Sequence, residues 1–332
     1  MLFRRGPLPL NQTQGGDKLS AGEVQKQRLY FFDNLRAFII LLVIVFHVAM
    51  GYTTWNLAWW YVNDTQKSLV FDVFVLETDV YIMPIMFLIA GYFSLPVLQK
   101  KEIVIFWREK LRRIALPWIG GVLLIAPLIA YSALFSRMAA PPDYFLFWKD
   151  QFWGAYYQQA HYWFLGILLL FFGVLIFAYK IKPSYFTQQE SAANPSAALF
   201  LRFALISATP FFVANLFYES DAWVNANYLF MIQPVRIGLH FCYFGLGIYA
   251  WKSAWFTSDG YRPKLLPWGM LAAVMLFVFL LYRIIFTIGP VILPLAKAGH
   301  AVVYAVFCLT VTMAFIAGFQ RFFNTDAWLW RR

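Results

Sequence analysis

Two ionisable residues share one face of an otherwise apolar segment near the start of the chain. Residues 33–48 read DNLRAFIILLVIVFHV and include Arg36 and His47. Eleven residues at about 100° each return to within about 20° of the starting direction, so both side chains lie on one helix face, about 16 Å apart along its axis. A guanidinium can hold an anion, and an imidazole can take up a proton near neutral pH. The spacing predicts one wall of a polar passage, with Asp33 one turn from Arg36.

Each residue alone also has a structural explanation. Arg36 could extend toward the membrane surface as an interfacial anchor. His47 could be a neutral, hydrogen-bonded core histidine. Ionisable residues inside a membrane segment are functional by default, and two of them on one face favour the functional interpretation.

The composition is typical of a membrane protein. Of 332 residues, 61% are hydrophobic and 13% are charged, whereas soluble proteins average roughly 45–50% and 25%. The net charge of +11 comes from basic residues between apolar runs, which indicates membrane topology and anionic lipids rather than a nucleic-acid partner. Cys242 and Cys308 both lie in apolar runs and predict no disulfide framework. The four histidines have no metal-ligand spacing, so no metal site is expected.

Eight apolar runs are long enough to cross a membrane as helices, and they predict an all-α, polytopic transmembrane bundle. Basic residues gather in the N-terminal tail and at 100–113, 180–182 and 252–264, whereas the alternate loops are poor in them. The positive-inside rule therefore predicts a cytoplasmic N terminus. The predicted spans are 34–54, 69–95, 114–135, 158–179, 198–218, 230–251, 266–289 and 296–319.

The N-terminal segment differs in character from the rest. Residues 1–28 are polar and lack the apolar core of a cleavable signal. We expect 1–28 to form a cytoplasmic tail and 29–332 to form a single transmembrane domain.

Four segments in order resemble the acyltransferase-3 family of integral membrane O-acyltransferases, which modify glycans. YFFDNLRA at 30–37, followed by His47, resembles the motif of its first helix. FLIAGYF at 87–93, REKLRRIALPW at 108–118 and HYWFLGILLLFF at 161–172 resemble three further family segments. Within the family, the first and fourth segments are most similar to the glucans biosynthesis protein C branch.

The resemblance implies a transferase that moves an acetyl or succinyl group from cytoplasmic acyl-CoA to a hydroxyl of an extracytoplasmic glycan, such as a periplasmic glucan. It implies a multi-pass protein of the bacterial inner membrane, with membrane lipids, acyl-CoA and a glycan as partners. His47 would be the catalytic base, and Arg36 would act with it. Arg36, Lys110, Arg112 and Arg113 would bind the phosphates of acyl-CoA. Acyl-CoA is then a donor substrate, and no permanently bound cofactor is expected.

Further polar residues are candidates for the acceptor side and the cavity wall. His161 and Trp163 are expected on the acceptor side. Arg236 and His240 share one face of the sixth span and, like Asp33, are candidates to line the cavity. A structural hydrogen-bond network is the alternative for Arg236 and His240.

Buried charges in the other spans need partners. Glu77 and Asp79 are expected to pair with Arg236 or Arg283. His300 is expected at the membrane interface.

The chain departs from the family pattern at several positions. Ala90 replaces a usual Ser, Lys110 replaces the first Arg of an Arg-x-x-Arg pair, and Leu168 stands where other branches have Glu. Lys110 keeps the charge but loses the planar bidentate geometry of Arg. The family usually has about ten spans, and the chain ends at WLWRR, so we expect a domain without the last family helices.

Two other functions compete with acyl transfer. A transporter or flippase of glycan or acyl groups could use the same polar cavity without chemistry. It would favour an inverted repeat, which the sequence does not display. A non-catalytic membrane scaffold is the third hypothesis.

Overall fold

The structure is a computed structural model. The predicted cytoplasmic tail, the end of the chain and the last residues of the seventh predicted span, 287–289, lie outside the residues that it describes. The described residues are 29–55, 60, 62–187, 194–257, 260–286 and 294–325.

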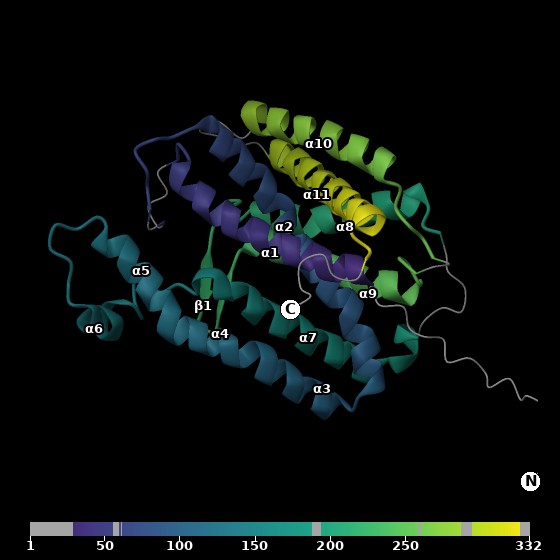
Figure 1. The fold of residues 1–332 in the computed structure, drawn as a ribbon, viewed down its shortest axis with the longest axis horizontal. Coiled ribbons are helices and arrows are strands. Elements are labelled where there is room, and N and C mark those ends of the chain that lie inside the picture. Colours follow the sequence, from purple (N-terminus) through teal and green to yellow (C-terminus); the bar gives the residue numbers. More distant parts are fainter. Residues whose placement is uncertain are drawn as a thin grey trace, which may run out of the picture.

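Helices dominate the described chain (Figure 1). The long single helices are α1 (Tyr30–Ala49), α2 (Leu69–Lys100), α7 (Trp163–Ile181), α8 (Ala197–Asn215), α9 (Pro234–Lys252), α10 (Leu265–Phe286) and α11 (Pro294–Phe322).

A further long helix passes through two π-helical turns and runs along one edge of the molecule in Figure 1. Its parts are α3 (Ile103–Lys110), η2 (Leu111–Ala115), α4 (Leu116–Gly120), η3 (Gly121–Ile125) and α5 (Ala126–Phe135). The remaining elements are short: η1 (Met50–Tyr52), α6 (Tyr144–Leu146), η4 (Phe147–Gln151), η5 (Ala160–Tyr162), η6 (Pro183–Phe186), and strands β1 (Val224–Ala226) and β2 (Phe230–Ile232), which pair antiparallel.

The predicted all-α, multi-pass architecture is confirmed. Within the described segments, seven helical stretches are long and apolar enough to cross a membrane. Helix α9 occupies the position of the sixth predicted span, the one that is not among these seven stretches, and it is less apolar because it carries Arg236, His240 and Lys252. The seven stretches are Tyr30–Tyr52, Leu69–Lys100, Ile103–Phe135, Ala160–Ile181, Ala197–Asn215, Leu265–Phe286 and Pro294–Phe322.

Helices α2 and α9 pack unusually closely, and glycines permit the approach. A Cβ atom on Gly91 would lie 2.0 Å from the carbonyl oxygen of Phe244. A Cβ atom on Gly247 would lie 2.0 Å from the carbonyl oxygen of Leu88. Small residues at such crossings let membrane helices approach backbone to backbone. The glycine of the FLIAGYF segment therefore positions α2 against α9, which carries Arg236.

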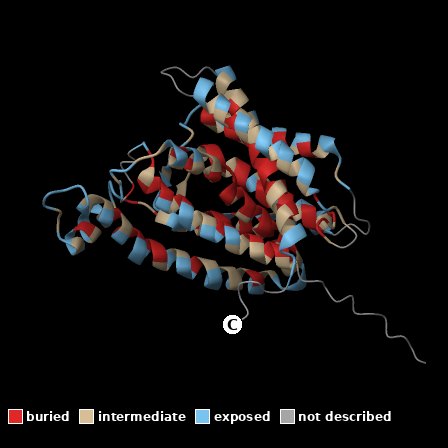
Figure 2. Cartoon of the chain, turned by 45° about the horizontal axis from the view of Figure 1, so that its top comes forward, coloured by how far each residue is buried: buried red, intermediate tan, exposed pale blue. Residues whose placement is uncertain are grey.

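Buried residues concentrate in the centre of the bundle, and outer helices present exposed residues (Figure 2). Helices α2, α9 and α11 are the most buried of the long helices. Helix α10 buries only Phe279 and lies beside α11 at the periphery (Figure 1). Large exposed apolar side chains on the outer helices suit contact with lipid.

Candidate active site

A cavity of about 1190 Å³ lies among the helices. Helices α1, α2, α7, α9, α10 and α11 contribute to its wall, together with the connections between them. All four histidines of the chain line it: His47, His161, His240 and His300. His300, for which a position at the membrane interface was expected, is thus buried at the cavity. Its ring packs in the bundle against Phe211 and Phe279.

His47 and His161 form a pair at this cavity. Their ring centroids are 4.2 Å apart and the rings are nearly perpendicular, at 74°. Trp60 stacks on the other side of His47, with centroids 5.5 Å apart and an interplanar angle of 27°. The sequence predicted separate roles for the two histidines, a catalytic base for His47 and an acceptor-side residue for His161. The structure places their rings side by side.

A hydrogen bond sets the orientation of the His47 ring. Nδ1 lies 2.6 Å from the carbonyl oxygen of Val43 in the preceding turn. A carbonyl oxygen can only accept, so Nδ1 must donate and carry the hydrogen. In the neutral ring, Nε2 then has a free lone pair, which is the form required of a general base.

The segment before His161 is anchored to the β1–β2 hairpin. The buried Gln159 amide donates to the carbonyl oxygen of Leu229 at 3.0 Å and to the hydroxyl of Tyr157 at 3.0 Å. Ala160 follows with φ of 44°, in the left-handed region that L-residues rarely adopt. This tight turn starts η5 and brings His161 to the cavity.

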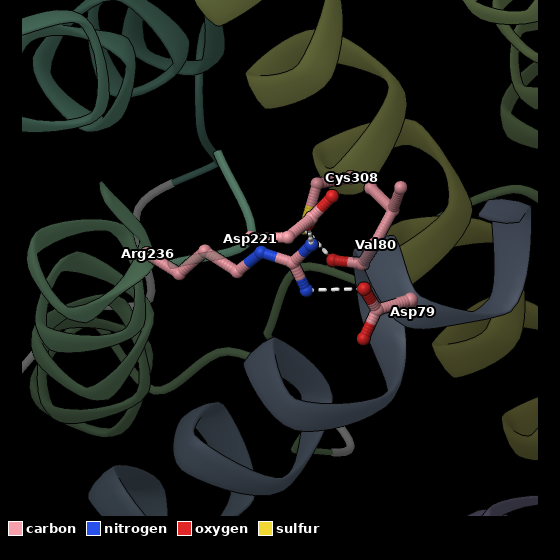
Figure 3. Close-up of polar contacts among 5 residues, drawn as sticks. All are labelled: Asp79, Val80, Asp221, Arg236 and Cys308. Atoms are coloured by element: carbon pink, nitrogen blue, oxygen red, sulfur yellow. Dashed lines mark hydrogen bonds and ion pairs between the residues drawn. The ribbon is translucent and has the colours of Figure 1, made fainter. Parts of the chain in front are cut away.

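A second polar group centres on Arg236 (Figure 3). Its guanidinium reaches from α9 to Asp79 of α2, and it also donates to Asp221 at 2.5 Å. The predicted pairing of Asp79 with Arg236 is confirmed. Glu77 instead accepts hydrogen bonds from the hydroxyls of Thr78 and Tyr81, at 3.1 and 3.4 Å.

Beside this group, the Cys308 thiol donates to the carbonyl oxygen of Val80 at 3.3 Å (Figure 3). This contact fastens α11 to α2 at the turn that carries Asp79. Cys308 is buried, whereas Cys242 is half-buried.

Aromatic rings connect the two polar groups. Trp163, two residues after His161, stacks on His240 with centroids 6.0 Å apart and meets Trp223 edge-on at 5.3 Å. His240 lies one turn from Arg236 on α9. Arg236 and His240 line the cavity as predicted, and Trp163 lines it as well.

Arg36 and Asp33 lie apart from this cavity. Neither belongs to the described residues that line it, and the nearest lining positions on α1 are Ile39 and Ile40, one turn away. Asp33, a candidate for the cavity wall, is thus not among the residues that line this cavity. It lies 3.9 Å from the Arg36 guanidinium at the opposite end of α1 from His47, with both side chains about 40% exposed.

Arg36 belongs to a basic group at that end. The Lys110 ammonium lies 4.3 Å from the ring centroid of Phe172, and Arg36 and Arg113 lie close enough to act on its charge. Arg112 and Arg113 are exposed. The four predicted phosphate ligands are thus carried by α1, α3 and η2, away from the histidine pair.

The sequence did not predict several of the residues that line the cavity. Asp221 and Trp223 lie in a short connection, where a carboxylate or an indole is ordinarily just solvent-exposed. Trp60 lies in a loop rich in aromatic residues, and nothing in the sequence marks it over its neighbours. Their common feature is a position in a connection between two predicted spans, which does not distinguish them from their neighbours.

The fold and this site define a polytopic membrane protein with a largely apolar cavity that holds a histidine pair and several charged side chains. The acyltransferase-3 family, whose sequence pattern is described as an acyltransferase domain, matches residues 29–331. The chain therefore belongs to the acyltransferase-3 family. No solved structure matches it.

Three curated relatives are similar to parts of this chain at 26–27% identity. "Glucans biosynthesis protein C" of Salmonella gallinarum is 26% identical over 213 residues, which cover 64% of this chain and 52% of the relative. The proteins of the same name from Shigella dysenteriae serotype 1 and Escherichia coli K12 are 27% and 26% identical over 159 residues, which cover 47% of this chain and 40% of each relative. The chain thus matches about half or less of the length of these relatives.

Proposed function

We propose that this protein is a membrane O-acyltransferase that moves an acetyl or succinyl group from acyl-CoA to a hydroxyl of a glycan. The observation that carries the proposal is the His47–His161 pair at the cavity, with the ring of His47 hydrogen-bonded to leave Nε2 as an acceptor. Membership of the acyltransferase-3 family supports acyl transfer. The names of the relatives support a glucan as the acceptor.

The proposed reaction begins at the acceptor hydroxyl, which is a poor nucleophile until a base takes its proton. Nε2 of His47 accepts that proton as the hydroxyl oxygen attacks the thioester carbonyl carbon. The new C–O bond forms, the C–S bond breaks, and the departing CoA thiolate recovers a proton from the imidazolium. The Nδ1–H bond to Val43 stabilises the protonated ring during the step.

The two ends of the molecule suit the two substrates. The basic group of Arg36, Lys110, Arg112 and Arg113 is suited to the phosphates of acyl-CoA. The positive-inside rule favours the cytoplasm for this end, and hence an extracytoplasmic opening for the end with His161. In this orientation the protein spans the bacterial inner membrane, takes acyl-CoA from the cytoplasm and meets the glycan on the far side.

Replacement of His47 tests the proposal. The full chain in lipid nanodiscs, given acetyl-CoA or succinyl-CoA and a glucan, should release free CoA, and His47→Ala should reduce that release at least about a hundredfold, because a positioned base typically contributes 10²–10⁴-fold. Free thiol is measured with a chromogenic reagent. The thermal midpoint of the variant reports whether it is folded.

A matched control separates catalysis from general damage. Ser94→Ala removes a buried polar side chain of α2 that does not line the cavity, and it should leave most of the release intact. Undiminished release in folded His47→Ala would exclude His47 as the base. If the parent protein binds both substrates yet releases no CoA, the site serves transport instead.

A further inference from the structure

An indole and a guanidinium from two different connections meet beside His47. Trp60 lies in the connection between η1 and α2, and its ring stacks on the His47 ring with centroids 5.5 Å apart. Arg137 directly follows the last turn of α5, and its Nη2 donates a hydrogen bond to the carbonyl oxygen of Trp60 at 2.5 Å. Trp60 is 5% exposed and lines the cavity. Arg137 is exposed and is not among the described residues that line it.

We infer that Arg137 is a positioning residue for His47. It holds Trp60 against the imidazole and acts on the reaction through that ring, without touching either substrate. The inference deepens the proposed function and rests on it for the role of His47 as the base.

The His47 ring needs support beyond its own hydrogen bond. The bond from Nδ1 to the carbonyl oxygen of Val43 fixes one nitrogen. The χ2 torsion of histidine has a broad minimum, however, so the ring plane can still tilt. Trp60 and His161 contact the ring from two directions and limit this tilt. Since a general base must point at the proton that it takes, loss of the stacked indole should slow the chemical step.

The connection that carries Trp60 is tied to the bundle on both sides of this residue. On one side, the backbone N–H and the hydroxyl of Thr54 donate to the buried carboxylate of Asp72 at 2.7 and 2.5 Å. On the other side, the N–H of Asp64 donates to the carbonyl oxygen of Gly51 at 2.9 Å. These bonds hold the flanks of the connection, and the bond from Arg137 holds Trp60 itself.

The backbone that presents the Arg137 guanidinium is also held in place. The N–H of Arg137 donates to the carbonyl oxygen of Leu134 at 3.1 Å, which continues the last turn of α5. The hydroxyl of Tyr131 donates to the carbonyl oxygen of Pro142 at 2.8 Å and folds the following connection back onto α5. Because the backbone is already ordered, the bond to Trp60 costs only the conformational entropy of the arginine side chain.

Steady-state kinetics of the full chain in lipid nanodiscs test the inference. Arg137→Ala should lower kcat for CoA release about tenfold, since a hydrogen bond to a charged group is worth such a factor. The KM for acyl-CoA should stay within about twofold of the parent value, because no interaction with substrate is lost. Arg137→Lys keeps a charged donor and should restore most of kcat. Lys149→Ala removes an exposed cation of η4 and is the matched control, with both constants unchanged.

A double-mutant cycle shows whether Arg137 acts through Trp60. Trp60→Ala should lower kcat at least as much as Arg137→Ala, and adding Arg137→Ala to Trp60→Ala should cause no further loss. If Arg137→Ala unfolds, Arg137→Met keeps the length of the side chain without the donor and takes its place. Additive losses, or a parent-like kcat in the folded Arg137 variant, would overturn the inference.

Chemical modification gives a readout that needs no turnover. Diethyl pyrocarbonate acylates accessible neutral imidazoles, and peptide mass spectrometry measures the rate at each histidine. Arg137→Ala should raise the rate at His47 about fivefold or more, because the lost bond frees the covering ring. The rate at His240, which packs against Phe87 and Trp163, should not change. An unchanged rate at His47 would overturn the inference.

The two readouts separate this inference from the proposed function. CoA release that depends on His47 but not on Arg137 would overturn the positioning role and leave acyl transfer standing. Faster modification of His47 in the Arg137 variant of a protein that releases no CoA would do the reverse.

Discussion

Arg36 and His47 occupy opposite ends of one helix, and their surroundings differ accordingly. His47 is enclosed by Trp60 and His161 at the cavity. Arg36 is half-exposed beside Asp33. The eleven-residue spacing predicted the shared face from helix geometry alone. It could not predict where the cavity stops, because that depends on side chains that α2, α7 and α9 bring from elsewhere in the chain.

Arg36→Ala should weaken acyl-CoA binding at least about tenfold, because a hydrogen bond between charged groups contributes roughly 1.5–3 kcal/mol. Titration calorimetry of the full chain with acyl-CoA measures the change. Arg202→Ala, which removes an exposed arginine of α8, is the control and should not alter affinity. Equal affinity in the Arg36 and Arg202 variants would remove Arg36 from the donor site.

Asp221 illustrates why part of the site could not be predicted. A carboxylate in a connection between two spans is ordinarily solvated, and its pairing with Arg236 depends on the path of the connection between α8 and α9, which no sequence period predicts. The partner of Asp79 was predictable, because a carboxylate inside a membrane span requires a cation and the neighbouring spans offer few.

Apolar runs predicted where the helices lie, and they did so well because a spanning helix must satisfy its own backbone. The long helix at 103–135 begins eleven residues before the predicted span at 114. Its basic first turns carry long side chains that reach past the apolar surface, as Lys110 does over Phe106 and Phe172. The π-helical turns and the β1–β2 hairpin have no comparable periodic signal.

The α2–α9 crossing gives a prediction at the scale of elements. Gly247→Ala places a Cβ atom 2.0 Å from the carbonyl oxygen of Leu88. Overpacking of this kind typically destabilises by about 1–3 kcal/mol, so the thermal midpoint of the protein in detergent should fall. Gly245→Ala, on the same helix but with nothing within 4 Å, should leave the midpoint unchanged or raise it. A lower midpoint in Gly245→Ala than in Gly247→Ala would contradict the close crossing.

At the scale of the whole molecule, the basic group and the cavity occupy different parts of the bundle. The basic group on α1, α3 and η2 stands at one end, and the histidine pair lies toward the other. This separation gives the molecule a polarity along its length, and the positive-inside rule predicts that the basic end faces the cytoplasm.

Cysteine labelling tests the direction. Ala139 and Lys182 are exposed in connections on opposite sides of the bundle. In intact cells, Ala139→Cys should react with a membrane-impermeant maleimide, whereas Lys182→Cys should react only after lysis. The unsubstituted protein, whose Cys242 and Cys308 lie inside helices, gives the background. The reverse pattern would place the basic end outside the cell.

Helix α10 buries a single residue, Phe279, yet it carries Arg283 to the cavity wall. Its support comes from α11 on one flank and from surrounding lipid on the rest. Bilayer thickness and lateral pressure therefore act on the placement of a guanidinium at the cavity wall, so that membrane composition becomes a physical variable of the shape of the cavity.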